Sequence, residues 1–167
     1  MEVSLTGDFC FAEAPGMSWC ELAYGLDRGF VSSRDVVDYA INSLSIDSPD
    51  AHYELAGLDG ADPNDVKDLL ARLRKSEKSE ERMRSIWIYL TLLWVYRNQD
   101  RYSDVLQVAE RLYADFDYPE CMASIIRYMP PKHPGRGGKA ELLENWRVLL
   151  DDCRSRLLPS LGCTRSE

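Results

Sequence analysis

The sequence predicts an all-α fold, a compact domain of about eight helices around one buried central helix. Residues 86–96 carry large apolar side chains at every position except Thr91, so a helix there is apolar on every face and must be surrounded by other elements. The stretch is too short for a bilayer span, which needs roughly 20 apolar residues. No convincing run of strand alternation occurs, whereas segments with helical spacing recur along the chain.

Four helices are expected ahead of the central one. The first contains Trp19, and Ser33 is the expected cap of the second. Two matching starts, each a capping side chain followed by proline at the first helical position, stand at residues 48–49 and 62–63. They predict helices over residues 50–58 and 64–73.

Three helices are expected after the central one. Residues 98–100 break the chain, and Ser103 is the expected cap of the next helix. A short helix then starts at Pro119, a loop rich in proline and glycine follows, and a last amphipathic helix ends before Pro159. The predicted organisation is an irregular lead-in over residues 1–16, one helical domain over 17–158 and a flexible tail over 159–167.

The central helix and its successor resemble a tetratricopeptide-type hairpin. Large and small residues alternate roughly as in such units, at Leu92, Tyr96, Tyr102, Leu106, Ala109 and Tyr113. A solenoid needs about three units and the sequence offers one, so a compact bundle is at least as well supported.

Charge is unevenly distributed along the chain. The net charge is -8, and residues 1–70 alone hold 14 Asp and Glu against 3 Lys and Arg. An acidic surface repels nucleic acid and anionic membranes and attracts basic proteins, so neither nucleic acid nor membrane is an expected partner. Solubility is the alternative explanation of the same charge.

Six aspartates lie around the two proline-marked helix starts: Asp47, Asp50, Asp59, Asp62, Asp65 and Asp68. Carboxylates at such places cap free N–H groups and complement the helix dipole. Capping needs one or two residues per helix, and this segment has more. We therefore expect the surplus to form a patch that binds a cationic protein partner.

No residue constellation predicts catalysis, a cofactor or a metal. The five cysteines are odd in number and lack zinc-ligand spacing, which favours free thiols in the cytoplasm, and the first residues lack signal-peptide features. His52 and His133 are the only imidazoles, and nothing marks a nucleophile for either. The glycines of residues 135–138 lack the strand that a nucleotide-binding motif requires. We expect a protein that is not an enzyme.

Two short strings, Tyr-Ala-Asp-Phe-Asp-Tyr-Pro at residues 113–119 and Arg-Tyr-Met-Pro at 127–130, resemble the signature of a bacterial family long catalogued as a domain of unknown function. Further matching pieces include Trp19, residues 24–25 and Trp87. The resemblance covers residues 19–130. It implies an immunity protein of a toxin–immunity system such as contact-dependent inhibition, which binds and neutralises a cognate toxin domain in the cytoplasm. Many such toxin domains are basic nucleases.

The core of this signature is Asp115, Phe116, Asp117, Tyr118 and Pro119. We interpret it as a structural motif, in which the two aromatic rings pin a loop to the core and Asp117 caps the helix that opens at Pro119. A direct binding role is the second interpretation. For the whole chain, a helical adaptor that binds a peptide and a small enzyme are the alternatives to an immunity protein.

Overall fold

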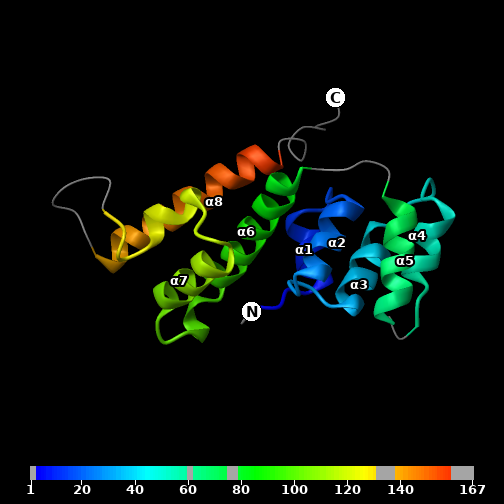
Figure 1. The fold of residues 1–167 in the computed structure, drawn as a ribbon, viewed down its shortest axis with the longest axis horizontal. Coiled ribbons are helices and arrows are strands. Elements are labelled where there is room, and N and C mark those ends of the chain that lie inside the picture. Colours follow the sequence, from blue (N-terminus) through cyan, green and yellow to red (C-terminus); the bar gives the residue numbers. More distant parts are fainter. Residues whose placement is uncertain (1–2, 60–61, 75–78, 131–137, 159–167) are drawn as a thin grey trace, which may run out of the picture. The chain divides into compact units, whose positions relative to one another are not determined.

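The computed structural model describes residues 3–59, 62–74, 79–130 and 138–158, and it confirms the all-α prediction. Every regular element in these ranges is helical (Figure 1). The α-helices are α1 (Gly7–Glu13), α2 (Trp19–Asp27), α3 (Ser33–Ser43), α4 (Asp50–Ala56), α5 (Pro63–Leu73), α6 (Glu80–Arg97), α7 (Val105–Asp115) and α8 (Lys139–Leu157). Two short 3-10 helices are η1 (Gln99–Arg101) and η2 (Glu120–Ile125). None of the described helices is both long and apolar enough to cross a bilayer.

The chain divides into two compact units, residues 1–90 and 91–167. Helix α6 runs through the boundary between them, so the expectation of one domain over residues 17–158 stays a prediction. The tail expected over residues 159–167 and most of the loop after Pro130 lie outside the described residues.

The lead-in over residues 1–16 is not irregular, because it contains α1. The Thr6 side chain accepts a hydrogen bond from the Phe9 backbone N–H at 3.3 Å and caps this helix. Gly7 lets the backbone approach α3 closely, since a Cβ there would lie 2.0 Å from the Asp35 carbonyl oxygen. Tertiary packing against α3, which a local sequence pattern does not record, therefore stabilises α1.

The apolar stretch of α6, residues 86–96, is buried as expected with two exceptions, Trp94 and Tyr96. Residues 86–93 and Val95 are all less than 9% exposed. Trp94 is only partly buried, and the Arg101 guanidinium lies over its ring, 5.5 Å from the ring centroid. In the other unit, Trp87 is fully buried and stacks on Phe30 at 5.2 Å between ring centroids.

The helix starts follow the predicted chemistry, in some cases one residue away. Asp62 caps α5 as expected, accepting from the Asn64 N–H at 2.8 Å. The cap of α3 is Ser32 rather than Ser33, because Asp35 completes a capping box with it. The cap of α7 is the residue after Ser103, Asp104, which accepts from two backbone N–H groups. Pro49 stands at the cap position of α4 with no side-chain cap.

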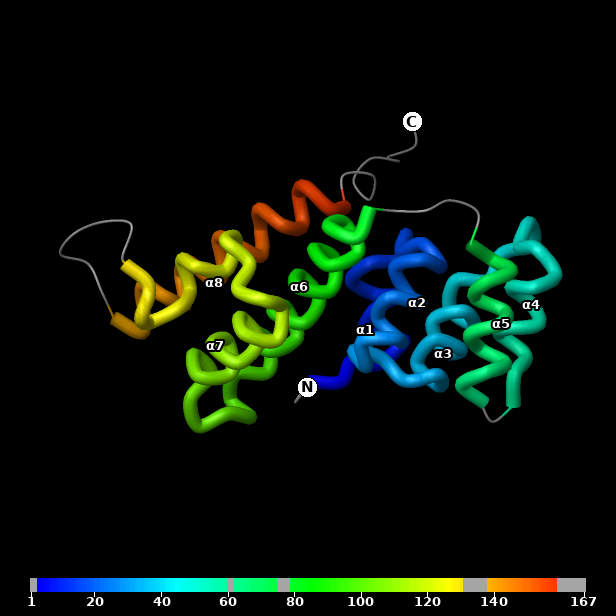
Figure 2. The backbone as a smooth tube through the Cα atoms, in the orientation of Figure 1, coloured from blue at the N-terminus to red at the C-terminus, as the bar shows by residue number. Residues whose placement is uncertain are grey.

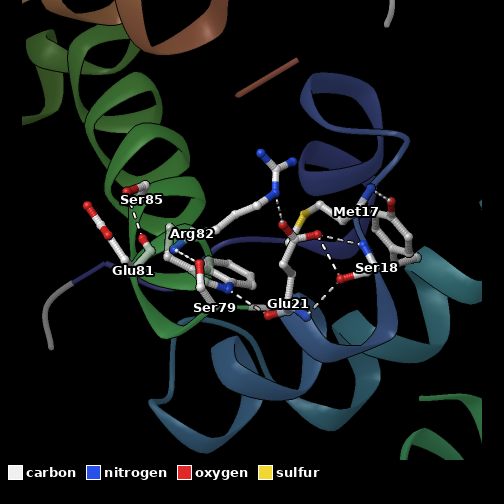
Figure 3. Close-up of polar contacts among 9 residues, drawn as sticks. Met17, Ser18, Glu21, Ser79, Glu81, Arg82 and Ser85 are labelled. Carbon is white, nitrogen blue, oxygen red and sulfur yellow. Dashed lines mark hydrogen bonds and ion pairs between the residues drawn. The ribbon is translucent and has the colours of Figure 1, made fainter. Parts of the chain in front are cut away.

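A buried carboxylate joins α2 to the first half of α6 (Figure 3). Glu21 is 2% exposed, and its Oε2 accepts from the Ser18 backbone N–H at 2.7 Å and from the Ser18 hydroxyl at 2.9 Å. Its Oε1 lies 3.1 Å from Nε of Arg82 in α6. The Trp87 indole N–H donates to the Glu21 carbonyl at 2.7 Å. One residue of α2 thus holds two residues of α6.

Candidate protein-binding surface

Helices α4 and α5 pack against each other (Figure 1). These helices and the loops beside them carry the six aspartates expected to bind a partner, all of them exposed. Asp47 lies in the loop before α4, and Asp50 is in the first turn of that helix. Asp59 follows α4, Asp62 caps α5, Asp65 is in the first turn of α5 and Asp68 is further along it.

The structure separates these aspartates into two groups. The first, Asp47 and Asp50, lies at the start of α4, and the second, Asp59, Asp62, Asp65 and Asp68, runs from the end of α4 to the middle of α5. Figure 2 shows that the chain runs downward along α4 and returns upward along α5, so the two helices are antiparallel. The Arg72 guanidinium, near the end of α5, pairs with Glu54 of α4 at 2.5 and 3.1 Å, and the charge of Asp50 also acts on it. The start of α4 therefore lies beside the end of α5, about 15 Å along the helix from Asp62. The six aspartates expected to form one patch are therefore spread along the length of α5.

None of the six carboxylates forms an ion pair in the part of the chain that the structure describes. The two basic residues of α5 that form ion pairs there use other carboxylates: Lys67 Nζ lies 3.0 Å from Asp27, and Arg72 pairs with Glu54. The Arg72 guanidinium lowers the pKa of Glu54 through these hydrogen bonds. Within the described ranges, each aspartate group therefore presents carboxylates without ion pairs of their own to solvent, with Arg72 acting on Asp50 at longer range.

Exposed apolar side chains stand next to the first group. Ile46 is 94% exposed, and Ile41, Leu44 and Tyr53, in the segments that adjoin it along the chain, are 46%, 36% and 47% exposed. These four side chains, together with Asp47 and Asp50, are called the Ile46 surface below. It comprises the end of α3, the loop over residues 44–49 and the start of α4 (Figure 2).

Hydrogen bonds fix the loop that presents Ile46. The Ser48 N–H donates to the Ser45 carbonyl at 3.0 Å, and the Ser45 N–H donates to the Ser48 hydroxyl at 3.0 Å. The Tyr53 hydroxyl donates to the same Ser45 carbonyl at 2.8 Å. Ile46 and Asp47 are the two central residues of this turn, so their side chains project from an ordered backbone. Ser48, expected as a cap of α4, closes this turn instead.

His52 has a structural position beneath the same surface. It is 5% exposed, and its Nε2 lies 2.9 Å from the Ala40 carbonyl and 3.1 Å from the Ser43 hydroxyl. Because a carbonyl only accepts, Nε2 carries the proton and donates to Ala40. The Trp19 ring meets the imidazole edge to face at 4.7 Å between centroids. These contacts hold α4 on α3, whereas His133 lies outside the described residues.

The remaining candidates for chemistry are dispersed. Cys121 is exposed on η2, and Cys10 and Cys153 are buried free thiols. Burial raises the pKa of Cys10 to about 12 and that of Cys153 to about 11, so both are protonated at neutral pH. Among the described residues, no group of three His, Cys, Asp or Glu side chains is placed to hold a metal ion.

The motif at residues 115–119 ends α7 rather than starting the next helix. The Tyr118 N–H donates to the Tyr113 carbonyl at 2.8 Å, and the Asp117 N–H donates to the Ala114 carbonyl at 2.9 Å. This is the Schellman arrangement, which satisfies the last carbonyls of a helix and requires a left-handed residue. Asp117 supplies that conformation with φ of 56°, and Tyr118 follows with φ of 53°.

The roles expected for the three central side chains of this motif are only partly right. Phe116 is 4% exposed and packs into the core as expected. Tyr118 is 59% exposed, although its ring rests edge-on against Tyr113 at 5.2 Å between centroids. Asp117 does not cap η2, whose cap position is Pro119 with no side-chain hydrogen bond. The structure assigns the motif to helix termination.

Residues 8–154 match a family model described as an uncharacterized protein conserved in bacteria (DUF2247). The chain belongs to this family. Comparisons with curated proteins and with solved structures found no match. The DUF2247 description names no activity, so the immunity function implied by the resemblance stays a prediction. The matched range includes the Ile46 surface, both aspartate groups and the Schellman motif.

Proposed function

We propose that this DUF2247 protein is an immunity protein, which binds a cognate toxin domain in the bacterial cytoplasm and neutralises it by forming a complex. The observation that carries the proposal is the exposed face of α4 and α5. Six exposed carboxylates, which form no ion pair among the described residues, lie along these helices and their loops, and two of them, Asp47 and Asp50, lie beside exposed apolar side chains. Such a face suits a basic protein partner, because charge speeds the encounter and apolar contact slows dissociation.

The resemblance carried by residues 113–119 and 127–130 adds the class of partner. In toxin–immunity systems the immunity gene directly follows the toxin reading frame. The partner to test is therefore the C-terminal toxin domain encoded immediately upstream of this chain's own gene. A basic nuclease domain fits the acidic face best, since its positive surface for nucleic acid would complement the carboxylates.

Growth protection tests the proposal. The toxin domain is expressed from an inducible promoter in a bacterial host, with or without this chain on a second plasmid. We expect induction to stop growth in the host that lacks the chain and to leave growth unchanged in the host that carries it. Loss of growth in both hosts, with both proteins detected in the soluble fraction, would contradict the proposal.

Charge-neutralised variants test the steering component separately. D47N/D50N and D62N/D65N each remove two negative charges from one aspartate group, and Asn at 62 retains the cap of α5. We expect each pair to slow association with the toxin domain, by more at low salt than at high salt, because ions screen exposed charges over about 10 Å at 0.1 M. If one pair leaves the association rate and its salt slope unchanged, that group lies outside the interface.

A further inference from the structure

We infer that the Ile46 surface is the apolar anchor of the complex, and that Ile46 enters an apolar pocket of a basic partner whose rim carries Lys or Arg. The identity of the partner rests on the proposed function, whereas the chemistry of the pocket rests on the local structure around Ile46. Two tasks are then separated within one interface. The aspartates govern how fast the partner arrives, and Ile46 governs how long it stays.

Ile46 is exposed on an ordered backbone. At 94% exposed, this side chain contributes almost nothing to the core, so folding gives no reason for an isoleucine there. The turn that carries it is closed by the Ser45–Ser48 hydrogen bonds and by the Tyr53 hydroxyl. A fixed turn loses little entropy on binding, which makes the projecting side chain an effective anchor.

Three partly exposed side chains can extend the apolar contact that Ile46 makes. Ile41, Leu44 and Tyr53 are each between one third and one half exposed, so their buried parts pack on the unit while their free parts extend the apolar contact. Tyrosine is enriched among the residues that dominate binding energy at interfaces. Its hydroxyl is already used by the Ser45 carbonyl, so the Tyr53 ring is held in place.

Charge decides the occupant. Asp47 and Asp50 border the apolar side chains, and among the described residues no cation forms an ion pair with either. A second copy of this chain would bring the same carboxylates against them, and an anionic membrane would be repelled in the same way. A pocket rimmed by Lys or Arg pairs with both aspartates while it buries Ile46.

The matched variants are I46S and V148S. Val148 of α8 is 51% exposed and lies outside the Ile46 surface, so its variant controls for the loss of any exposed β-branched side chain. Ile46 is almost fully exposed and Val148 is half exposed, so I46S should keep the dichroism spectrum and unfolding midpoint of the wild type, and V148S should keep the spectrum with at most a small change in midpoint. Binding to the upstream-encoded toxin domain is measured by surface plasmon resonance in a salt series.

We expect I46S to dissociate about 10-fold to 100-fold faster than the wild type, as the loss of one fully buried isoleucine implies. Its association rate and salt slope should be unchanged. D47N/D50N should show the opposite pattern, with slower association, a weaker salt slope and little change in dissociation. V148S should match the wild type. If the wild-type chain binds the toxin domain and I46S dissociates at the same rate, the inference is overturned while the proposed function stands.

A second arm decides the inference when the toxin domain does not bind. The full-length chain labelled with nitrogen-15 is titrated with the peptide acetyl-Lys-Leu-Lys-Lys-Leu-Leu-Lys-amide and with the same peptide carrying Glu in place of each Lys. We expect amide shifts at Leu44, Ile46 and Tyr53 with the basic peptide only, and their loss in I46S. Absent shifts, shifts confined to other elements, or equal shifts with the acidic peptide would overturn the inference. Self-association in sedimentation that I46S abolishes would overturn it too.

Discussion

A single methyl group added at Gly25, in the compact unit over residues 1–90, should destabilise the fold. Gly25 lies in α2 opposite the buried Trp87 ring of α6, and a Cβ built on it would lie 2.0 Å from Cζ2, 2.3 Å from Cε2 and 2.6 Å from Cη2 of the indole. Non-bonded heavy atoms do not approach each other this closely, so the G25A substitution must move the indole ring. The ring has little freedom, because it stacks on Phe30 and its N–H bonds the Glu21 carbonyl.

The expected destabilisation follows from three terms. Overpacking a well-packed core costs about 1–3 kcal/mol. A shift of the ring also weakens the 2.7 Å hydrogen bond from Trp87 to Glu21, a contribution of about 1 kcal/mol. Alanine in place of glycine inside a helix stabilises the helix by about 0.5–1 kcal/mol, which offsets part of this loss. We therefore expect G25A to lower the free energy of unfolding by about 2 kcal/mol.

Urea unfolding followed by tryptophan fluorescence and by far-ultraviolet dichroism measures this change. G16A is the matched control, since nothing lies within 4 Å of a Cβ at Gly16, and it should stay within about 0.5 kcal/mol of the wild type. W87L removes the indole ring that the new methyl group would meet. Adding G25A to W87L should therefore lower the free energy of unfolding by less than G25A lowers it in the wild type. Wild-type stability of G25A, or strict additivity with W87L, would refute this account of the packing.

Three further predictions concern other parts of the chain. R82M leaves the buried Glu21 carboxylate without its cation and should lower the free energy of unfolding by about 3 kcal/mol in urea. R147M, which breaks the exposed Arg147–Glu144 pair, should lower it by less than about 1 kcal/mol. Equal losses would contradict the conclusion that Arg82 stabilises a buried charge. D117A should be less stable than D117G by about 1 kcal/mol in the same assay. Both variants remove the carboxylate, and only alanine is strained at the positive φ of this position. The opposite order of stability would argue against the left-handed turn. Iodoacetamide at pH 8 should label Cys121 well before Cys10 and Cys153 in the folded protein. Burial shields Cys10 and Cys153 and raises the pKa of both thiols. Mass spectrometry that finds Cys10 labelled first would contradict this prediction.

The parts of the fold that sequence could predict are those specified by local pattern. The charge-free run over residues 86–96 indicated a buried helix, and burial over residues 86–93 bears this out. The Asp62-Pro63 start of α5 was predictable because capping chemistry lies within three residues. Adjacent candidates caused the errors at α3 and α7, where two polar residues stand side by side and tertiary geometry decides between them.

Features that depend on chain direction in space were not predictable. The aspartates are close in sequence, but the reversal between α4 and α5 puts Asp50 beside Arg72 and leaves Asp62 at the other end of α5. Helix α1 depends on the close approach of Gly7 to α3. The left-handed Asp117 carried a signal that was overlooked, an aromatic pair five residues apart at Tyr113 and Tyr118 across the end of a helix.

Ile46 gave no signal in the sequence. An isolated isoleucine next to an aspartate has the composition of many half-buried loop positions, and only the orientation of the Ser45–Ser48 turn makes it project into solvent. Exposure of an apolar side chain is a property of packing, so this part of the proposed interface required coordinates.

Titration of the toxin domain with this protein tests the central claim most directly. The purified domain encoded upstream is assayed for its activity, for a nuclease the cleavage of nucleic acid, while the purified chain is added in increasing molar ratio. An immunity protein that acts by forming a complex should reduce the activity in proportion to its amount and abolish it at one equivalent, with no dependence on incubation time. Full activity at a large excess of the chain would contradict the claim, and complete inactivation by a small fraction of an equivalent would show an enzyme instead.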